Sequence, residues 1–92
     1  ALKRGVAAER AQDYDRAVAE YTNAVRQRPG DVSARTALER ARLRAASDHF
    51  TRGRRLAATV KPDAALVEYE LALELNPTSG DIETELRAVR QQ

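Results

Sequence analysis

Two stretches of the chain share one pattern and decide its fold. They are DRAVAEYTNAVRQRP, from Asp15 to Pro29, and DAALVEYELALELNP, from Asp63 to Pro77. A shift of 48 positions superimposes them, and it aligns small, aromatic and helix-breaking residues rather than charges alone. The same shift places Gly5 on Gly53. The sequence therefore predicts one structural unit that is used twice.

The apolar residues of both stretches recur at the spacing of a helical stripe. These residues are Ala17, Tyr21 and Ala24 in the first stretch, and Ala65, Tyr69 and Ala72 in the second. Each helix should end just before its proline, because a proline ring disfavours α geometry in the preceding residue. Along the whole chain this pattern predicts an all-α fold of antiparallel hairpins, with helices over residues 2–12, 15–28, 32–60, 63–75 and 80–91.

The third predicted helix is unusually long and carries two apolar seams. One seam consists of Leu38, Ala41, Ala45, His49 and Leu56, and the other of Leu43, Ala46, Phe50, Gly53 and Ala57. A helix with two apolar faces is expected to pack on both sides. We therefore expect its first half to close one hairpin and its second half to open the next, within a single domain of repeat units 1–48 and 49–92.

The composition argues against catalysis. The chain has no cysteine, and His49 is its only histidine, so neither a cysteine-based metal site nor a histidine cluster can form. Its four glycines stand apart from one another, so no glycine-rich phosphate loop is present. No apolar run approaches the roughly 20 residues that a membrane span requires. We expect a protein that is not an enzyme, holds no cofactor or metal and does not itself insert into a membrane.

Charge is distributed unevenly along the chain. Residues 35–61 hold eight basic side chains and only two acidic ones, whereas residues 63–85 hold seven acidic side chains and no basic one. A basic surface on the long helix would attract an acidic protein partner. The alternatives are pairing within the chain, or nucleic acid, which the lack of aromatic side chains among the arginines disfavours. The candidate partner-binding residues are Arg35, Arg42, Phe50, Arg52, Arg54 and Arg55.

The two stretches resemble the second half of a tetratricopeptide repeat. That family places Ala, an aromatic residue, Ala and Pro at the spacing of Ala17, Tyr21, Ala24 and Pro29, and again of Ala65, Tyr69, Ala72 and Pro77. Its helix-packing glycine falls on Gly5 and Gly53. The period is 48 rather than the family's 34 residues, which adds one helix per unit. The resemblance implies a module that binds other proteins.

The resemblance also implies where a peptide would lie, along the first helix of each unit. The matching positions are Leu2, Val6, Glu9 and Arg10 in the first unit, and Phe50, Arg54, Ala57 and Ala58 in the second. The first helices depart from the family pattern, because its tryptophan position is filled by Ala1 and His49. The lysine and asparagine pattern that clamps a C-terminal carboxylate in some members is absent.

A narrower similarity concerns the order of the segments. The chain has a repeat, then the arginine-rich segment from Thr36 to Arg44, then the segment from Phe50 to Arg54, and then a second repeat. This order resembles a helical region of bacterial secretin-type outer-membrane proteins. That similarity implies a periplasmic or outer-membrane location and a role in assembling a secretion system or pilus; without it, a cytoplasmic location is expected. The ends of the chain suggest a fragment of a longer protein.

Together these observations predict a scaffold module for protein–protein interaction or assembly. Two alternatives remain open at this stage. One is a basic helical domain that binds nucleic acid, and the other is a module that associates with further copies of itself through the seams of the long helix.

Overall fold

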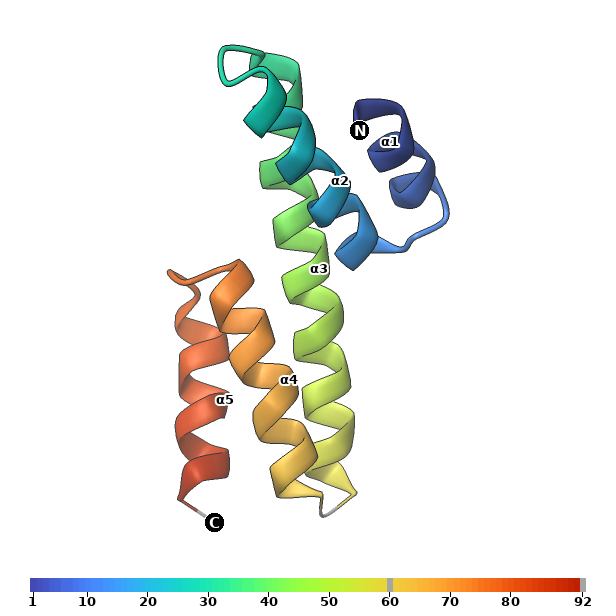
Figure 1. Cartoon of the computed structure of the whole chain (residues 1–92). Coiled ribbons are helices and arrows are strands. Elements are labelled where there is room, and N and C mark those ends of the chain that lie inside the picture. The colour runs from blue at the N-terminus through green and yellow to red at the C-terminus, as the bar shows by residue number, and fades with distance from the viewer. Residues whose placement is uncertain (60, 92) are drawn as a thin grey trace. The chain divides into compact units, whose positions relative to one another are not determined.

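The computed structural model describes residues 1–59 and 61–91, which form five α-helices and no strands (Figure 1). The all-α class is therefore confirmed. The helices are α1 (Leu2–Arg10), α2 (Tyr14–Gln27), α3 (Val32–Ala58), α4 (Pro62–Leu75) and α5 (Gly80–Arg90). The predicted boundaries are close to these, although the predicted end of the third helix at residue 60 lies outside the described residues.

Short polar side chains fix where the helices begin. The Asp31 carboxylate accepts a hydrogen bond from the backbone N–H of Ala34 at the start of α3, at 3.2 Å. The Ser79 hydroxyl accepts one from the backbone N–H of Ile82 at the start of α5, at 3.3 Å. Such caps satisfy N–H groups that have no partner within the helix. Pro62 opens α4, where a missing N–H costs nothing.

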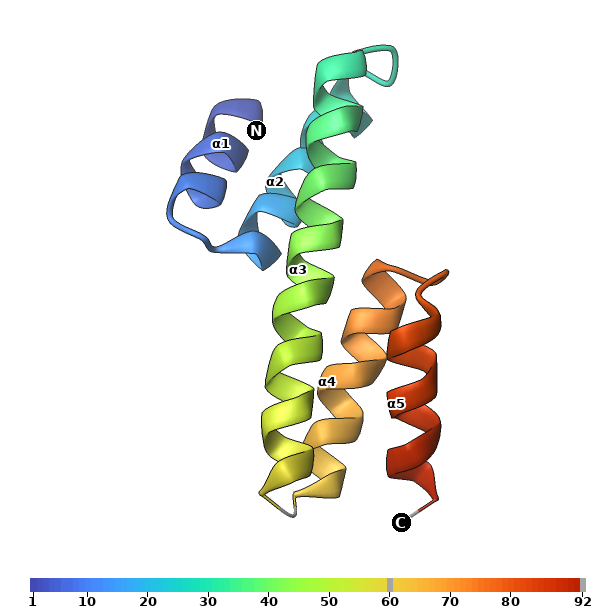
Figure 2. The ribbon, with the colours of Figure 1, turned by 180° about the vertical axis from the view of Figure 1, so that it is seen from behind.

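The chain divides into two compact units, Ala1–Ala45 and Ala46–Gln92, so that α3 contributes to both. In the first unit α1 and α2 form a hairpin, and α2 lies beside the first part of α3 in both views (Figures 1 and 2). The core of this unit is made of Ala8, Ala17, Tyr21, Ala37 and Ala41, with Val18 and Leu38 packed against it. The small alanines let the backbones approach closely around the Tyr21 ring.

The second unit repeats this packing with α4, α5 and the second part of α3. Here α4 runs beside α3 and α5 runs beside α4 (Figure 2). The core is made of Ala65, Tyr69, Leu86 and Val89, and Phe50, Leu56, Ala57, Leu66 and Leu73 pack against it. Tyr21 and Tyr69 are the largest side chains that are fully buried among the described residues.

A tyrosine ring lies against a glycine in each unit. A Cβ atom added to Gly5 would lie 2.4 Å from Cε1 of Tyr21, and one added to Gly53 would lie 2.5 Å from Cε1 of Tyr69. Both distances are far below van der Waals contact. Each ring therefore occupies the space that any larger residue at its glycine would need.

One part of the predicted second seam is wrong. Leu43 is 54% exposed, whereas Ala46 and Gly53 farther along the same seam are buried. In the first unit, α1 and α2 pack on the face of α3 that carries Ala37 and Ala41. Leu43 lies two residues beyond Ala41, about 200° around the helix, and so points away from that core. The hairpin geometry of tetratricopeptide repeats stays a prediction, since the structure establishes the helical class alone.

Candidate functional site

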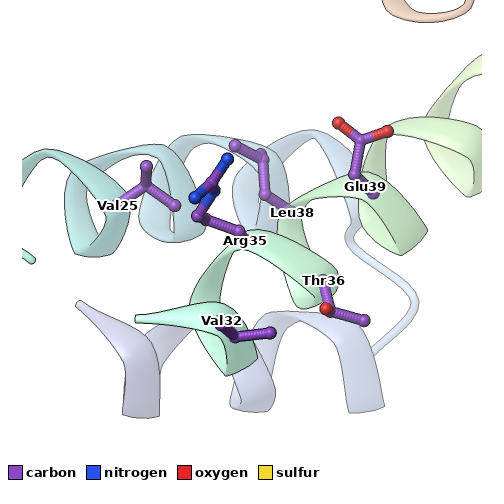
Figure 3. A pocket seen from close by; sticks show the side chains of 6 residues that line it. All are labelled: Val25, Val32, Arg35, Thr36, Leu38 and Glu39. Atoms are coloured by element: carbon purple, nitrogen blue, oxygen red, sulfur yellow. The ribbon is translucent and has the colours of Figure 1, made fainter. Parts of the chain in front are cut away.

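A groove of about 380 Å³ opens between α2 and the start of α3 in the first unit (Figure 3). Its lining residues are Val25, Val32, Arg35, Thr36, Leu38 and Glu39. Val32 is the most exposed large apolar side chain in the described chain, at 71%. Val32 therefore does not contribute to the core of the first unit.

Arg35, one of the predicted partner-binding residues, borders this groove together with Glu39. Both are exposed. The groove therefore combines three apolar side chains with one threonine, one basic side chain and one acidic side chain. Sequence reasoning identified Arg35 from charge alone and missed Val32, whose isolated position before the apolar seam gave no periodic signal.

A network of three polar side chains ties the helices of the first unit together. The Tyr21 hydroxyl donates to Oε1 of Glu9 at 2.6 Å. Arg40 donates to the same carboxylate twice, from Nε to Oε2 at 2.6 Å and from a terminal nitrogen to Oε1 at 2.8 Å. The fork of two bonds is the strongest geometry available to an arginine and a carboxylate.

The network shifts the acidity of its members. The hydrogen bonds from Arg40 lower the pKa of Glu9 from 4.5 to about 2, against the opposing effect of burial. Burial raises the pKa of Tyr21, and the hydrogen bond to Glu9 raises it further. Glu9, which the family resemblance assigns to ligand binding, is therefore already engaged within the chain. Leu2 and Val6, its companions on α1, are exposed.

Several arginines of the long helix act within the chain. Besides Arg40, the guanidinium of Arg44 lies 5.8 Å from the centre of the Tyr14 ring, within cation–π range. Arg42 is half-buried and has an interaction partner. Arg52 is 3.8 Å from Oε1 of Glu68, a loose and half-exposed ion pair. These contacts support pairing within the chain, the alternative that charge counting left open.

His49 lies in the second unit and is buried at 5% exposure. Its Nδ1 is 2.6 Å from Oε1 of Glu68, the same carboxylate oxygen that Arg52 approaches. The sequence did not pair these residues, because they lie 19 positions apart on α3 and α4. Their spacing carries no local signal, and only the packing of the two helices brings them together.

A second groove, of about 280 Å³, opens between α3 and α5 in the second unit. It is lined by Phe50, Arg54, Asp81, Thr84 and Glu85. The guanidinium of Arg54 lies 5.6 Å from the centre of the Phe50 ring. The structure thus brings two predicted site residues together, and it adds the acidic residues of α5, which sequence reasoning did not include.

The six predicted partner-binding residues do not form one group. Arg35 and Arg42 belong to the first unit, and the other four to the second. Within the second unit Arg52 and Arg55 are three residues apart and lie only about 60° from each other around α3, whereas Arg54 lies about 160° from Arg52. Arg55 is exposed near the end of α3. Of the six, Arg35 lines the groove of the first unit, and Phe50 and Arg54 line a groove of the second unit.

The described residues contain no group of three or more His, Asp or Glu side chains that could hold a metal ion. Within the same residues no helix is both long and apolar enough to cross a bilayer.

No family model matches the chain, and no curated protein matches it. The similarities to tetratricopeptide and secretin-type proteins therefore remain predictions from the sequence.

Proposed function

We propose that this domain is a protein-interaction module, and that a partner docks in the groove of the first unit. The observation that carries the proposal is the exposure of Val32 in a groove whose lining also includes Val25, Leu38, Arg35 and Glu39 (Figure 3). A partner that covers this groove would remove apolar surface from water. Full burial of one valine or leucine side chain contributes about 1.5–3 kcal/mol.

The charge of the first unit indicates the chemistry of the partner. Residues 1–45 carry ten lysine and arginine side chains against six acidic ones. Such a surface attracts an acidic segment and raises its rate of association, and salt weakens the attraction. The proposed ligand is therefore a segment that places an apolar side chain on Val32 and an acidic one near Arg35.

Site-specific crosslinking tests the proposal. A photo-reactive amino acid at position 32, in the groove, is compared with one at position 43, which is also exposed on α3 but does not border the groove. We expect one partner to crosslink from position 32 and not from position 43. Crosslinks from both positions alike, or from neither, would refute a docking site in this groove.

Binding with purified components then measures the contribution of the groove. Val32→Ser should weaken the binding of the identified partner about 5- to 30-fold, equivalent to a loss of about 1–2 kcal/mol, whereas Leu43→Ser should leave it unchanged. A second copy of this chain as the crosslinked protein would redirect the proposal to self-association. The secretin resemblance adds the proposal that the module assembles a bacterial secretion or pilus system, which recovery of envelope proteins as partners would support.

A further inference from the structure

One residue that lines a groove of the second unit, Phe50, packs against a buried tyrosine whose hydroxyl has no partner among the described residues. Tyr69 is fully buried, and its hydroxyl forms no hydrogen bond with any of the residues that the structure describes. Its ring packs against Phe50, with 5.7 Å between ring centres, and Phe50 lines the groove. A buried hydroxyl without a partner is costly, and native proteins rarely leave one in that state.

The internal repeat shows what the second unit lacks. Tyr69 corresponds to Tyr21 of the first unit. The hydroxyl of Tyr21 donates a hydrogen bond to Glu9, and Arg40 in turn donates to the carboxylate of Glu9. At the shift of 48 positions, Ala57 replaces Glu9 and Ala88 replaces Arg40. The second unit therefore has the tyrosine but lacks both side chains that complete the network in the first unit.

The charges around Tyr69 indicate which missing group a ligand would supply. Burial raises the pKa of Tyr69, and the negative charge of Glu85 raises it further, while Arg54 acts in the opposite direction. Both charged residues line the groove, as does Asp81. The lining thus has two carboxylates and one guanidinium. The two carboxylates would repel a ligand carboxylate. They would attract a ligand cation that takes the place that Arg40 has in the first unit.

We propose that the groove between α3 and α5 binds an arginine or lysine side chain of a protein partner, which donates a hydrogen bond to the Tyr69 hydroxyl oxygen and pairs with Glu85 and Asp81. The second unit as a whole favours such a ligand, since residues 46–92 carry eight acidic side chains against six basic ones. This site is separate from the groove of the first unit. It rests on the proposal that the domain binds proteins, but it uses different residues.

A peptide titration followed by NMR tests this site in the whole chain. The probes are acetyl-Ala-Arg-Ala-amide, the same peptide with citrulline, which keeps the shape of arginine without its charge, and the same peptide with glutamate. We expect the arginine peptide to shift the backbone amide signals of Arg54, Thr84 and Glu85 in a saturable way. The citrulline peptide should bind at least about fivefold more weakly, and the glutamate peptide should not bind.

Three variants assign the effect to the proposed contacts. Ala88→Arg restores the arginine of the first unit within the chain and should abolish peptide binding. The matched control Ala19→Arg adds an arginine at an exposed position of α2 and should not affect it. Glu85→Gln and Tyr69→Phe should each weaken binding at least about fivefold, because each removes one contact with the cation.

Several results would overturn the proposal. These are equal binding of the arginine and citrulline peptides, tighter binding of the glutamate peptide, absence of any saturable shift, or unchanged binding by Ala88→Arg. None of these results depends on Val32, so the site in the second unit and the function proposed for the first can fail independently.

Discussion

Replacing Gly53 by alanine should destabilise the second unit, although alanine is the better helix former. In an open helical position the exchange stabilises a helix by about 1 kcal/mol. At Gly53, however, the new Cβ atom would lie 2.5 Å from Cε1 and 2.6 Å from Cδ1 of Tyr69. The ring is fully buried and cannot move aside without disturbing the core. Overpacking of this kind costs about 1–3 kcal/mol.

The expected net effect is a loss of up to about 2 kcal/mol in the free energy of unfolding, because the clash with a rigid ring exceeds the gain in helix propensity. For a domain of this size, that loss lowers the Tm by up to about 15 °C. Thermal and urea unfolding followed by far-UV circular dichroism would measure both quantities. Gly80→Ala is the matched control, since no atom lies within 4 Å of its added Cβ, and it should be neutral or stabilising.

A double-mutant cycle identifies the cause. In a Tyr69→Leu background the shorter side chain leaves room near residue 53, so Gly53→Ala should cost less there than in the native chain. The explanation is refuted if Gly53→Ala stabilises the protein as much as Gly80→Ala does, or if its cost is the same in both backgrounds.

Three further predictions concern the polar groups. Because the pKa of Glu9 is lowered to about 2 in the folded protein from 4.5, its pair with Arg40 stabilises fully above pH 4.5 and loses its effect as the pH falls toward 2. Allowing for the partial exposure of Arg40, we expect Glu9→Gln to remove about 1–2 kcal/mol from the free energy of unfolding at neutral pH. The variant's stability should also fall less steeply between pH 4.5 and 2 than that of the native chain. An unchanged dependence of stability on pH would contradict this expectation. Tyr21→Phe should lower the free energy of unfolding in urea by about 1–2 kcal/mol, because the Tyr21 hydroxyl has a hydrogen-bond partner. Tyr69→Phe without ligand should be neutral or stabilising, because the Tyr69 hydroxyl has none among the described residues. Equal losses would show that both hydroxyls are satisfied. Ser79→Ala should cost about 1 kcal/mol in the same assay, since it removes the cap of α5, and no loss would mean that the cap contributes nothing.

Local signals in the sequence were sufficient for the helices. Helical spacing of apolar residues identified the stripe of Tyr21 and that of Tyr69, and the prolines and capping residues placed the helix ends close to where the structure has them. These features act over a few neighbouring residues, so a single sequence displays them directly. The repeat at 48 positions likewise follows from the sequence alone.

The candidate sites were less predictable, because charge along a chain does not show which charges meet. The basic character of α3 was evident, but Arg40 binds Glu9 across 31 positions, and His49 meets Glu68 across 19. Leu43 is exposed, although its position in an apolar seam of the sequence predicted that it would be buried. Whether an apolar residue is buried depends on which helices pack against it, and that is a property of the assembled unit.

The sequence by itself determined that this protein is helical, where its helices begin and end, and that its two halves follow one plan. Only the tertiary structure showed what the differences between the halves do to their contacts. It showed that the hydroxyl of Tyr21 is satisfied by Glu9 while that of Tyr69 is not, and that Val32 lies uncovered in a groove. Helix formation follows from local propensity and periodicity, whereas the pairing of polar groups and the opening of grooves depend on side chains that only folding brings together.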